Sequence, residues 1–292
     1  MELLHDRFRI LDLVNEGGQG RIYVVKELKS NEMKALKLYQ YRPSPLAYPY
    51  NPEELESKGW RIPNGLREFL IWASPDQRME RFLKRQVLLQ SKLDHPSILQ
   101  AQELILEKPY CQILPLVRGG SLRSMSRKKK GLTFHQTGVY LAQLVQILDH
   151  CHQRGVIHRD IKPDNVLIGE SQKVILTDFD FAHFPVNGWK EMFLTRYYRY
   201  KGTAYYMSPE HLRGAFPHPG MDQYSLATTL YEIMSLELPF GKDLRSREDL
   251  SNYKPLPFLN KKQNEALKVA LEPKPKNRYS NIVQLYTNLY SH

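Results

Sequence analysis

Residues 158–165 read His-Arg-Asp-Ile-Lys-Pro-Asp-Asn and place three different kinds of reactive polar group in one short stretch. The Asp160 carboxylate can orient an attacking hydroxyl and accept its proton. The Lys162 ammonium can neutralise charge on a transferred γ-phosphate, and the Asn165 amide oxygen can ligate Mg²⁺. This combination indicates phosphoryl transfer, whereas a polar turn after a helix is the structural alternative.

Further short motifs follow in an order that matches a known family. Residues 178–180 read Asp-Phe-Asp, residues 202–203 read Gly-Thr, and residues 208–210 read Ser-Pro-Glu. With 158–165, they resemble the H-R-D-x-K-x-x-N, D-F-G and A-P-E motifs of eukaryotic-type (Hanks-type) serine/threonine protein kinases. The resemblance covers about residues 7–288. It implies a bilobal kinase fold, with ATP as the phosphate donor and Mg²⁺ as the metal.

The resemblance assigns metal-binding and bracing roles around the catalytic loop. Asp178 would hold Mg²⁺ together with Asn165. Thr203 would brace both Asp160 and Lys162 and so counts as part of the catalytic set.

Structural and regulatory roles follow from the same resemblance. Asp222 would anchor the catalytic loop from a buried helix, and Glu210 would pair with Arg278. The aromatic and basic stretch 189–201 corresponds to the activation segment, where Arg159 would receive a phosphate. The candidate phosphorylation sites in this stretch are Thr195, Tyr197, Tyr198 and Tyr200.

A glycine-rich stretch near the N-terminus resembles the phosphate-covering loop of the family. Residues 15–22 read Asn-Glu-Gly-Gly-Gln-Gly-Arg-Ile, in which Gly17 and Gly20 would allow close approach of the backbone to phosphates. A dinucleotide-binding fingerprint requires a helix after the glycines, and the strand-like run at 22–25 excludes it. A plain structural hairpin is the alternative.

Residues 35–37, Ala-Leu-Lys, stand where the family carries its strand lysine, so Lys37 would contact the α- and β-phosphates. A lone strand lysine is otherwise usually solvated. The resemblance also implies one apolar slot for adenine, although each of its residues alone is equally explained as core. The slot would be lined by Val14, Ile22, Ala35, Leu114, Leu116 and Leu167.

Two positions depart from the family pattern. The helix glutamate that pairs with the strand lysine is replaced by Gln86, a neutral and weaker hydrogen-bond acceptor. Asp180 replaces the glycine of D-F-G and restricts the backbone there. We hypothesise that Asp180 approaches Lys37 and supplies the missing charge; the alternative is a surface carboxylate in a loop.

Periodicity along the chain predicts the elements that position these residues. Three strands are expected within 7–38, with a turn at the glycines. The other expected strands are 102–106, 111–117, 166–168 and 174–176, and the expected helices are 76–93, 136–153 and 221–236. This order predicts an α+β protein with an antiparallel, β-rich N-lobe at 1–117 and a helical C-lobe at 118–292.

An insertion of about residues 41–75 interrupts the N-lobe. It is rich in proline and tyrosine and contains Trp60 and Trp72. Two tryptophans favour packing over a disordered decoration, so we expect the insertion to brace the helix bearing Gln86 or to bind a partner.

The balance of charged residues indicates which classes of binding partner are favoured. The chain of 292 residues has 42 Lys and Arg against 31 Asp and Glu, a formal net charge of +11. Such a balance favours anionic partners, among them acidic protein substrates, nucleic acid and an anionic membrane surface. The basic run at 127–130 is interpreted first as a solvated face, with membrane or nucleic-acid contact second.

Cysteine content and hydropathy give an expectation for the cellular location of the chain. Cys111 and Cys151 are the only cysteines, which implies no disulfide framework and suits a reducing compartment. No apolar run reaches the ~18 residues of a membrane span, and the N-terminus does not resemble a secretory signal. The expected location is the cytoplasm, or a host cytosol if a bacterial pathogen delivers the chain.

Three function classes compete. The first is an ATP- and Mg²⁺-dependent protein kinase acting on Ser/Thr hydroxyls, including its own. The second is a pseudokinase that binds nucleotide or acts as a scaffold, for which Gln86 and Asp180 are the evidence. The third is a small-molecule kinase, disfavoured by the peptide-docking motifs at 202–210. The retained Lys37, Asp160 and Asp178 favour the first.

Overall fold

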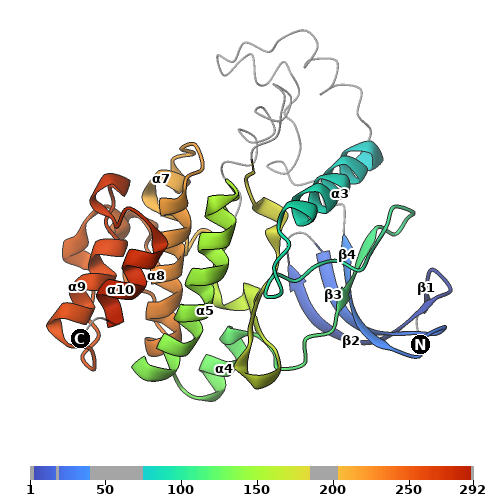
Figure 1. The fold of residues 1–292 in the computed structure, drawn as a ribbon, viewed down its shortest axis with the longest axis horizontal. Coiled ribbons are helices and arrows are strands. Elements are labelled where there is room, and N and C mark those ends of the chain that lie inside the picture. Colours follow the sequence, from blue (N-terminus) through green and yellow to red (C-terminus); the bar gives the residue numbers. More distant parts are fainter. Residues whose placement is uncertain (1–2, 18–19, 40–74, 185–202, 291–292) are drawn as a thin grey trace, which may run out of the picture. The chain divides into compact units, whose positions relative to one another are not determined.

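The alternating apolar residues near the N-terminus form antiparallel strands in the computed structural model, which describes residues 3–17, 20–39, 75–184 and 203–290. The six strands follow the order β1-β2-β3-β4-β6-β5. The first four of them are labelled in Figure 1. Their bounds are β1 Leu3–Leu4, β2 Phe8–Gly17, β3 Gly20–Glu27, β4 Met33–Tyr39, β5 Glu103–Ile105 and β6 Cys111–Pro115. The expected insertion, apart from its last residue, and the stretch 189–201 lie outside the described residues.

The described chain divides into two units. The first contains Met1–Lys92 and Leu99–Val117, and the second contains Leu93–Ile98 and Arg118–His292. All six strands of the large sheet belong to the first unit.

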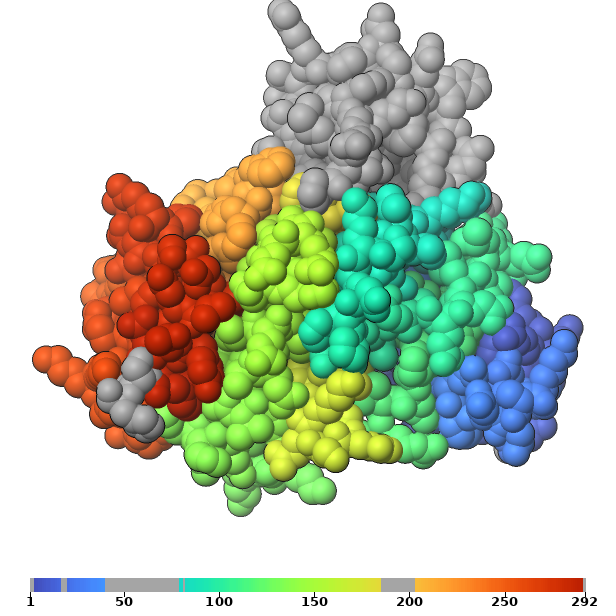
Figure 2. All heavy atoms as spheres, viewed as in Figure 1, coloured from blue at the N-terminus to red at the C-terminus, as the bar shows by residue number. Residues whose placement is uncertain are grey.

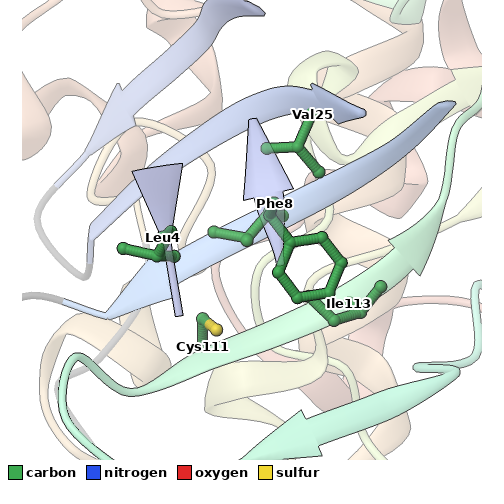
Figure 3. Close-up of a cluster of buried hydrophobic side chains, with 6 residues drawn as sticks. Leu4, Phe8, Val25, Cys111 and Ile113 are labelled. Carbon is green, nitrogen blue, oxygen red and sulfur yellow. The ribbon is translucent and has the colours of Figure 1, made fainter. Parts of the chain in front are cut away.

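A cluster of apolar side chains fills one face of this sheet. Leu4, Phe8, Val25, Cys111 and Ile113 come from four different strands and are all buried (Figure 3). Burial of a large apolar side chain stabilises a fold by ~1.5–3 kcal/mol. The cluster therefore holds the short first strand, which the sequence pattern did not reveal, against β2 and β6.

Gly20 has a structural reason to be glycine that is independent of any ligand. Its φ is +153°, and a Cβ atom built there would lie 2.0 Å from the carbonyl oxygen of Leu38 on β4. Any side chain at this position would push β3 and β4 apart. The glycine thus serves the pairing of Gly20 with Tyr39, whatever its role toward phosphates.

Helix α3, Pro75–Lys92, packs against β4 within the first unit. Tyr39, Met79 and Leu83 form a buried cluster, and the rings of Tyr39 and Phe82 meet edge to face at 5.7 Å. Met79 and Leu83 are four residues apart and share one helix face. Gln86 continues that face and is only 2% exposed.

Helices dominate the second unit, and side-chain caps define several of their starts. The Thr133 hydroxyl accepts the N–H of Gln136, and the Gln136 side chain accepts the N–H of Thr133. Such a capping box satisfies two otherwise unpaired N–H groups. The helices are α4 Leu122–Lys128, α5 Phe134–Gln153, α7 Pro209–Leu212, α8 Pro219–Ser235, α9 Lys261–Ala270 and α10 Ile282–Tyr290.

Helix α8 supplies the core of the second unit, with 13 of its 17 residues buried. Helix α10 lies alongside α5 (Figure 2), where the Phe134 and Tyr290 rings stack at 4.4 Å and the Tyr290 hydroxyl donates to the Phe134 carbonyl. Among the described residues, no helix is long and apolar enough to cross a membrane.

A small antiparallel ladder and several 3₁₀ turns complete the second unit. The ladder joins β7 Val166–Ile168 to β8 Val174–Leu176. The 3₁₀ turns are η1 Pro163–Asn165, η2 Glu170–Gln172, η3 Phe179–Phe181, η5 Leu244–Glu248, η6 Leu250–Asn252 and η7 Pro275–Asn277. A β-rich first unit and a helical second unit confirm the predicted α+β class.

Candidate active site

A buried aspartate on α8 holds the backbone of the catalytic-loop candidate, residues 158–165. Asp222 accepts the backbone N–H groups of His158 at 2.9 Å and Arg159 at 2.8 Å, and contacts Nε2 of His152 at 2.8 Å. Arg159 has a φ of +70°, a conformation that is costly for a residue other than glycine. The hydrogen bonds from Asp222 therefore stabilise a strained turn just before Asp160.

Asp222 is fully buried but remains a hydrogen-bond acceptor. Burial by itself would raise its pKa. The hydrogen bond and the charge of His152 and the N–H of Arg159 lower the pKa of Asp222 below its ordinary value. The side chain is thus ionised at neutral pH, when it can accept all three hydrogen bonds.

Asp160 is surrounded by donors on both of its oxygens. Oδ1 accepts the N–H and the hydroxyl of Thr203 at 2.8 and 2.9 Å. Oδ2 accepts Nζ of Lys162 at 2.7 Å and Nδ2 of Asn165 at 2.9 Å. Since a carboxylate has about four lone-pair sites, these four donors fill them and fix the group in one orientation. The fold therefore brings four of the predicted residues into direct contact.

Thr203 connects the lysine to the aspartate. Its Oγ1 accepts from Nζ of Lys162 at 2.7 Å and donates its single hydrogen to Asp160. A hydroxyl has one hydrogen to give, so the order Lys162 to Thr203 to Asp160 is determined by the donor inventory. Thr203 lies far from Asp160 in the sequence, and the bond joins the catalytic loop to the segment that precedes α7.

Asn165 and Asp178 offer oxygen ligands at the same end of the small ladder. The Thr177 N–H donates to the Asn165 carbonyl at 3.0 Å, so Asp178 follows directly after a residue bonded to Asn165. Nδ2 of Asn165 is committed to Asp160, which makes Oδ1 the amide atom available to a cation. Amide and carboxylate oxygens are ligands that Mg²⁺ prefers, so the donor set fits this ion.

His158 links the catalytic loop to the Asp-Phe-Asp motif. Its Nδ1 accepts the Asp160 N–H at 3.2 Å, while Nε2 lies 3.1 Å from the Thr177 carbonyl. One nitrogen accepts and the other donates, which corresponds to a neutral imidazole with its hydrogen on Nε2. The ring also meets Phe179 edge to face at 4.5 Å.

Glu210 and Arg278 form a buried, two-pronged ion pair, with both N–O distances at 2.7 Å. Burial alone would raise the pKa of Glu210, but the hydrogen bond and charge of Arg278 lower it. The Arg278 guanidinium also lies 5.0 Å from the Tyr224 ring on α8. The pair thus fixes α7 against the rest of the second unit.

Arg159 is 2% exposed. Its guanidinium donates to the Phe181 carbonyl at 3.3 Å and lies 3.3 Å from Nε2 of His211. The residues predicted as phosphate carriers, 195–200, lie outside the described residues. The phosphate-receiving role of Arg159 therefore stays a prediction.

In the first unit, Lys37 lies on the side of β4 that faces α3. It is 8% exposed, and its ammonium lies 5.3 Å from the centre of the Tyr39 ring. Alternate strand residues point to the same face, so Lys37 shares the side on which Tyr39 contacts α3. Gln86 is buried on the sheet-facing side of that helix.

The residues proposed for adenine are distributed over both units. Ala35 pairs with Leu114 across β4 and β6, and Ile22 pairs with Lys37 across β3 and β4. Val14 on β2 is 58% exposed. The other two are Leu116, half-buried just after β6, and Leu167, half-buried on β7 of the second unit.

Comparison with known proteins decides the family. The sequence matches the family described as "Protein kinase domain" over residues 73–290, well over half of the chain. The chain belongs to the protein kinase domain family. The match begins at α3, so the assignments of Gly17, Gly20 and Lys37 depend on the sequence resemblance.

Individual relatives of this kinase domain resemble it at low identity. "Hormonally up-regulated neu tumor-associated kinase homolog B" of Xenopus laevis is 29% identical over 74% of this chain and 35% of its own. "Serine/threonine-protein kinase AtPK1/AtPK6" of Arabidopsis thaliana is 26% identical over 94% of this chain and 52% of its own. "Serine/threonine-protein kinase PkaB" of Streptomyces coelicolor is 33% identical over 60% of this chain and 43% of its own. The kinase domain spans about a third to a half of these proteins.

Asp180 is not the surface carboxylate in a loop that was one of the two interpretations of the sequence. It lies in the turn η3 and is 3% exposed, so the interpretation as a solvated loop carboxylate is wrong. Its proposed approach to Lys37 joins residues of different units and stays a prediction.

Sequence reasoning missed several residues of the kinase domain that contact the site. His152 binds Asp222, and Arg123 on α4 donates to Asp164 at 2.9 Å and also to Glu232 and the hydroxyl of Tyr206. No motif marks a lone arginine or histidine, because its partners are distant in the sequence. The position of Asp164 within the catalytic loop was the one available signal.

Proposed function

We propose that this kinase domain is an active enzyme that transfers the γ-phosphate of ATP to Ser/Thr hydroxyls of proteins, including its own. The observation that carries the proposal is the orientation of Asp160 by Thr203, Lys162 and Asn165. A general base must be held within hydrogen-bond reach of the proton it accepts, and this arrangement holds the carboxylate in one pose.

Each residue of the cluster has a role in the proposal. Asp160 would orient the attacking hydroxyl and accept its proton. Because both of its oxygens are already occupied, one donor must leave to admit the hydroxyl. The Lys162 side chain is 19% exposed, and it would turn toward the transferred phosphate and release Oδ2. Thr203 would keep its two hydrogen bonds to Oδ1 throughout.

Asn165 and Asp178 would hold Mg²⁺ in the second unit. A bound Mg²⁺ ion supplies neutralisation of phosphate charge and keeps the phosphates in a defined geometry. In the first unit, Lys37 would contact the α- and β-phosphates, and the turn with Gly17 and Gly20 would cover them. The adenine set described above would provide apolar contacts to the base.

A pseudokinase is the alternative, and one observation favours it. Gln86 is buried where the family carries a glutamate, so this helix position offers Lys37 a neutral amide instead of a carboxylate. The intact cluster around Asp160 favours activity. A domain that only bound nucleotide would have no need for a carboxylate held in one orientation by four hydrogen bonds, as Asp160 is.

We infer cytosolic location and acidic protein substrates as secondary features. Cys111 and Cys151 are both free and buried, which suits a reducing compartment. The formal net charge of +11 favours acidic partners. Fractionation of cells expressing the chain tests the location, and recovery in an oxidising compartment would contradict it.

Labelled ATP tests the proposal. The wild-type chain should incorporate γ-phosphate into itself and into casein with Mg²⁺ and not after chelation, and the label should map to Ser or Thr. Lys37→Met should abolish incorporation, while the exposed Lys173→Met should not. Nucleotide binding without any transfer by the wild type would establish the pseudokinase alternative.

A further inference from the structure

Arg247 forms hydrogen bonds to the backbone of the segment that connects Thr203 to α7. Its guanidinium donates to the carbonyl oxygens of Ala204 at 2.7 Å, Tyr205 at 2.6 Å and Met207 at 2.7 Å. Three carbonyls are thus held by one planar group, which presents its donors in a rigid fork. No sequence motif identified this arginine.

The burial of Arg247 has an energetic cost that needs a reason. The side chain is 2% exposed, and all of its hydrogen bonds within the described residues go to neutral carbonyls. The neighbouring carboxylate, Glu248, is exposed and pairs with Arg213 instead. Burial lowers the pKa of Arg247, as expected for a cation whose hydrogen-bond partners in the described part of the chain are neutral carbonyls. Replacing a buried charged group by an apolar side chain of similar volume is often neutral for stability, which directs attention to the geometry that Arg247 gives the segment.

The held segment is fixed at its other atoms as well. The Ser225 hydroxyl on α8 donates to the Tyr206 carbonyl at 2.8 Å, and the Tyr206 hydroxyl donates to Glu232 at 2.5 Å. At its start, Thr203 donates to Asp160. The Tyr205 side chain, by contrast, is 42% exposed.

The position of this segment indicates which part of a protein substrate it can contact. Tyr205 is two residues from Thr203, which touches the proposed base. Each residue of an extended chain spans at most ~3.6 Å, so Tyr205 lies within two residue lengths of Thr203. A polypeptide whose hydroxyl reaches Asp160 would therefore place the residue beside that hydroxyl on the exposed edge of the segment.

We propose that Arg247 is a positioning residue for protein substrates: it holds residues 204–207 in a preformed docking edge whose exposed side chain is Tyr205. This inference rests on the proposed protein kinase function. Arg247 acts through the backbone of the segment and does not itself touch the substrate. The role concerns binding of the polypeptide, so it should be visible in KM for protein.

Steady-state kinetics with casein and ATP test the role. Arg247→Met should raise KM for casein by about tenfold or more, with kcat at saturating casein and KM for ATP changed much less. Arg247→Lys keeps the charge but loses the fork, so its KM should be intermediate. Tyr205→Ala alters only the exposed edge and should raise KM for casein in a normally folded protein. The matched control is Arg245→Met, an exposed arginine of the same turn.

A second readout separates this inference from the proposed function. Hydrogen exchange of the backbone amides of residues 203–208 should be faster in Arg247→Met than in the Arg245→Met control. This measurement does not depend on whether the enzyme transfers phosphate. Unchanged exchange, unchanged KM for casein in an active enzyme, or an equal loss of kcat in both Arg247 variants would overturn the positioning role. A wild type that transfers no phosphate would refute the proposed function alone, and hydrogen exchange would then decide the role of Arg247.

Discussion

Thr203 donates both its backbone N–H and its hydroxyl to the same oxygen of Asp160, at 2.8 and 2.9 Å. The hydroxyl simultaneously accepts from Lys162. One residue from outside the catalytic loop therefore supplies both donors to Oδ1 of the proposed base.

Replacement of Thr203 by Val removes the hydroxyl and keeps the shape and the backbone donor. We expect kcat for phosphate transfer to fall by roughly 10- to 100-fold, because a misoriented base loses most of its proximity advantage. Thr203→Ser should retain most of the activity. Equal rates for Thr203→Val and wild type in an initial-rate assay would show that the backbone donor alone suffices.

Replacement of Lys162 by Met removes the cation from Oδ2 of Asp160. We expect kcat to fall by roughly 10²- to 10³-fold, the effect typical of losing one donor that stabilises transition-state charge. KM for ATP should change little, because the lysine is proposed to act on the transferred phosphate. Lys173→Met, on an exposed lysine of the same unit, serves as the control. A large rise in KM for ATP with unchanged kcat would contradict the assignment.

The Glu210–Arg278 pair makes stability depend on pH. The pKa of Glu210 is lowered in the folded state, so its contribution is complete above its ordinary value of 4.5 and is lost as the pH falls through the lower, folded value. Glu210→Gln should be less stable than wild type at pH 7 by ~3–5 kcal/mol, since it leaves Arg278 buried without its anion. Urea unfolding at several pH values measures both effects.

The difference between wild type and Glu210→Gln should shrink as the solution is acidified from neutral pH toward about pH 3. The exposed carboxylate of Glu265 on α9 provides the control, and Glu265→Gln should show neither effect. A difference that stays constant across this range would mean that the ion pair does not stabilise the fold.

Gln86 provides a test of the active against the inactive interpretation. Lys37 and Gln86 lie on facing sides of β4 and α3, so Gln86→Glu should place a carboxylate on the side of α3 that faces Lys37 and lower KM for ATP by about threefold or more. Val87→Glu places the same charge on the exposed side of the helix and should leave KM unchanged. If Gln86→Glu weakens nucleotide binding, the glutamine is not a substitute for the family glutamate.

The sequence predicted the elements well where local patterns decide them. Strands β2, β3 and β4 follow from alternating apolar residues, and α8 from its continuous apolar surface, although it begins two residues earlier than expected, at Pro219. Proline suits the first helical turn because the N–H it lacks would have no partner there. The two-residue strand β1 was missed, because two leucines carry no periodicity.

The candidate site was predictable only where residues form motifs. Residues 158–165 and the Asp-Phe-Asp motif could be found by spacing, and the fold joins Asp160 to Thr203 as the resemblance implied. Arg123, His152 and Arg247 were not predictable, because long-range contacts alone give them partners. Gly20 was interpreted through phosphate binding, yet the carbonyl of Leu38 already excludes a side chain there.

The rate of γ-phosphate transfer to casein by Asp160→Ala, compared with wild type, tests the central claim most directly. Loss of a general base typically costs ~10²–10⁴ in rate, so we expect transfer to fall by at least 10²-fold. Thermal unfolding and nucleotide binding should show that the variant is folded and still binds ATP. Transfer by Asp160→Ala within twofold of the wild-type rate would contradict the account.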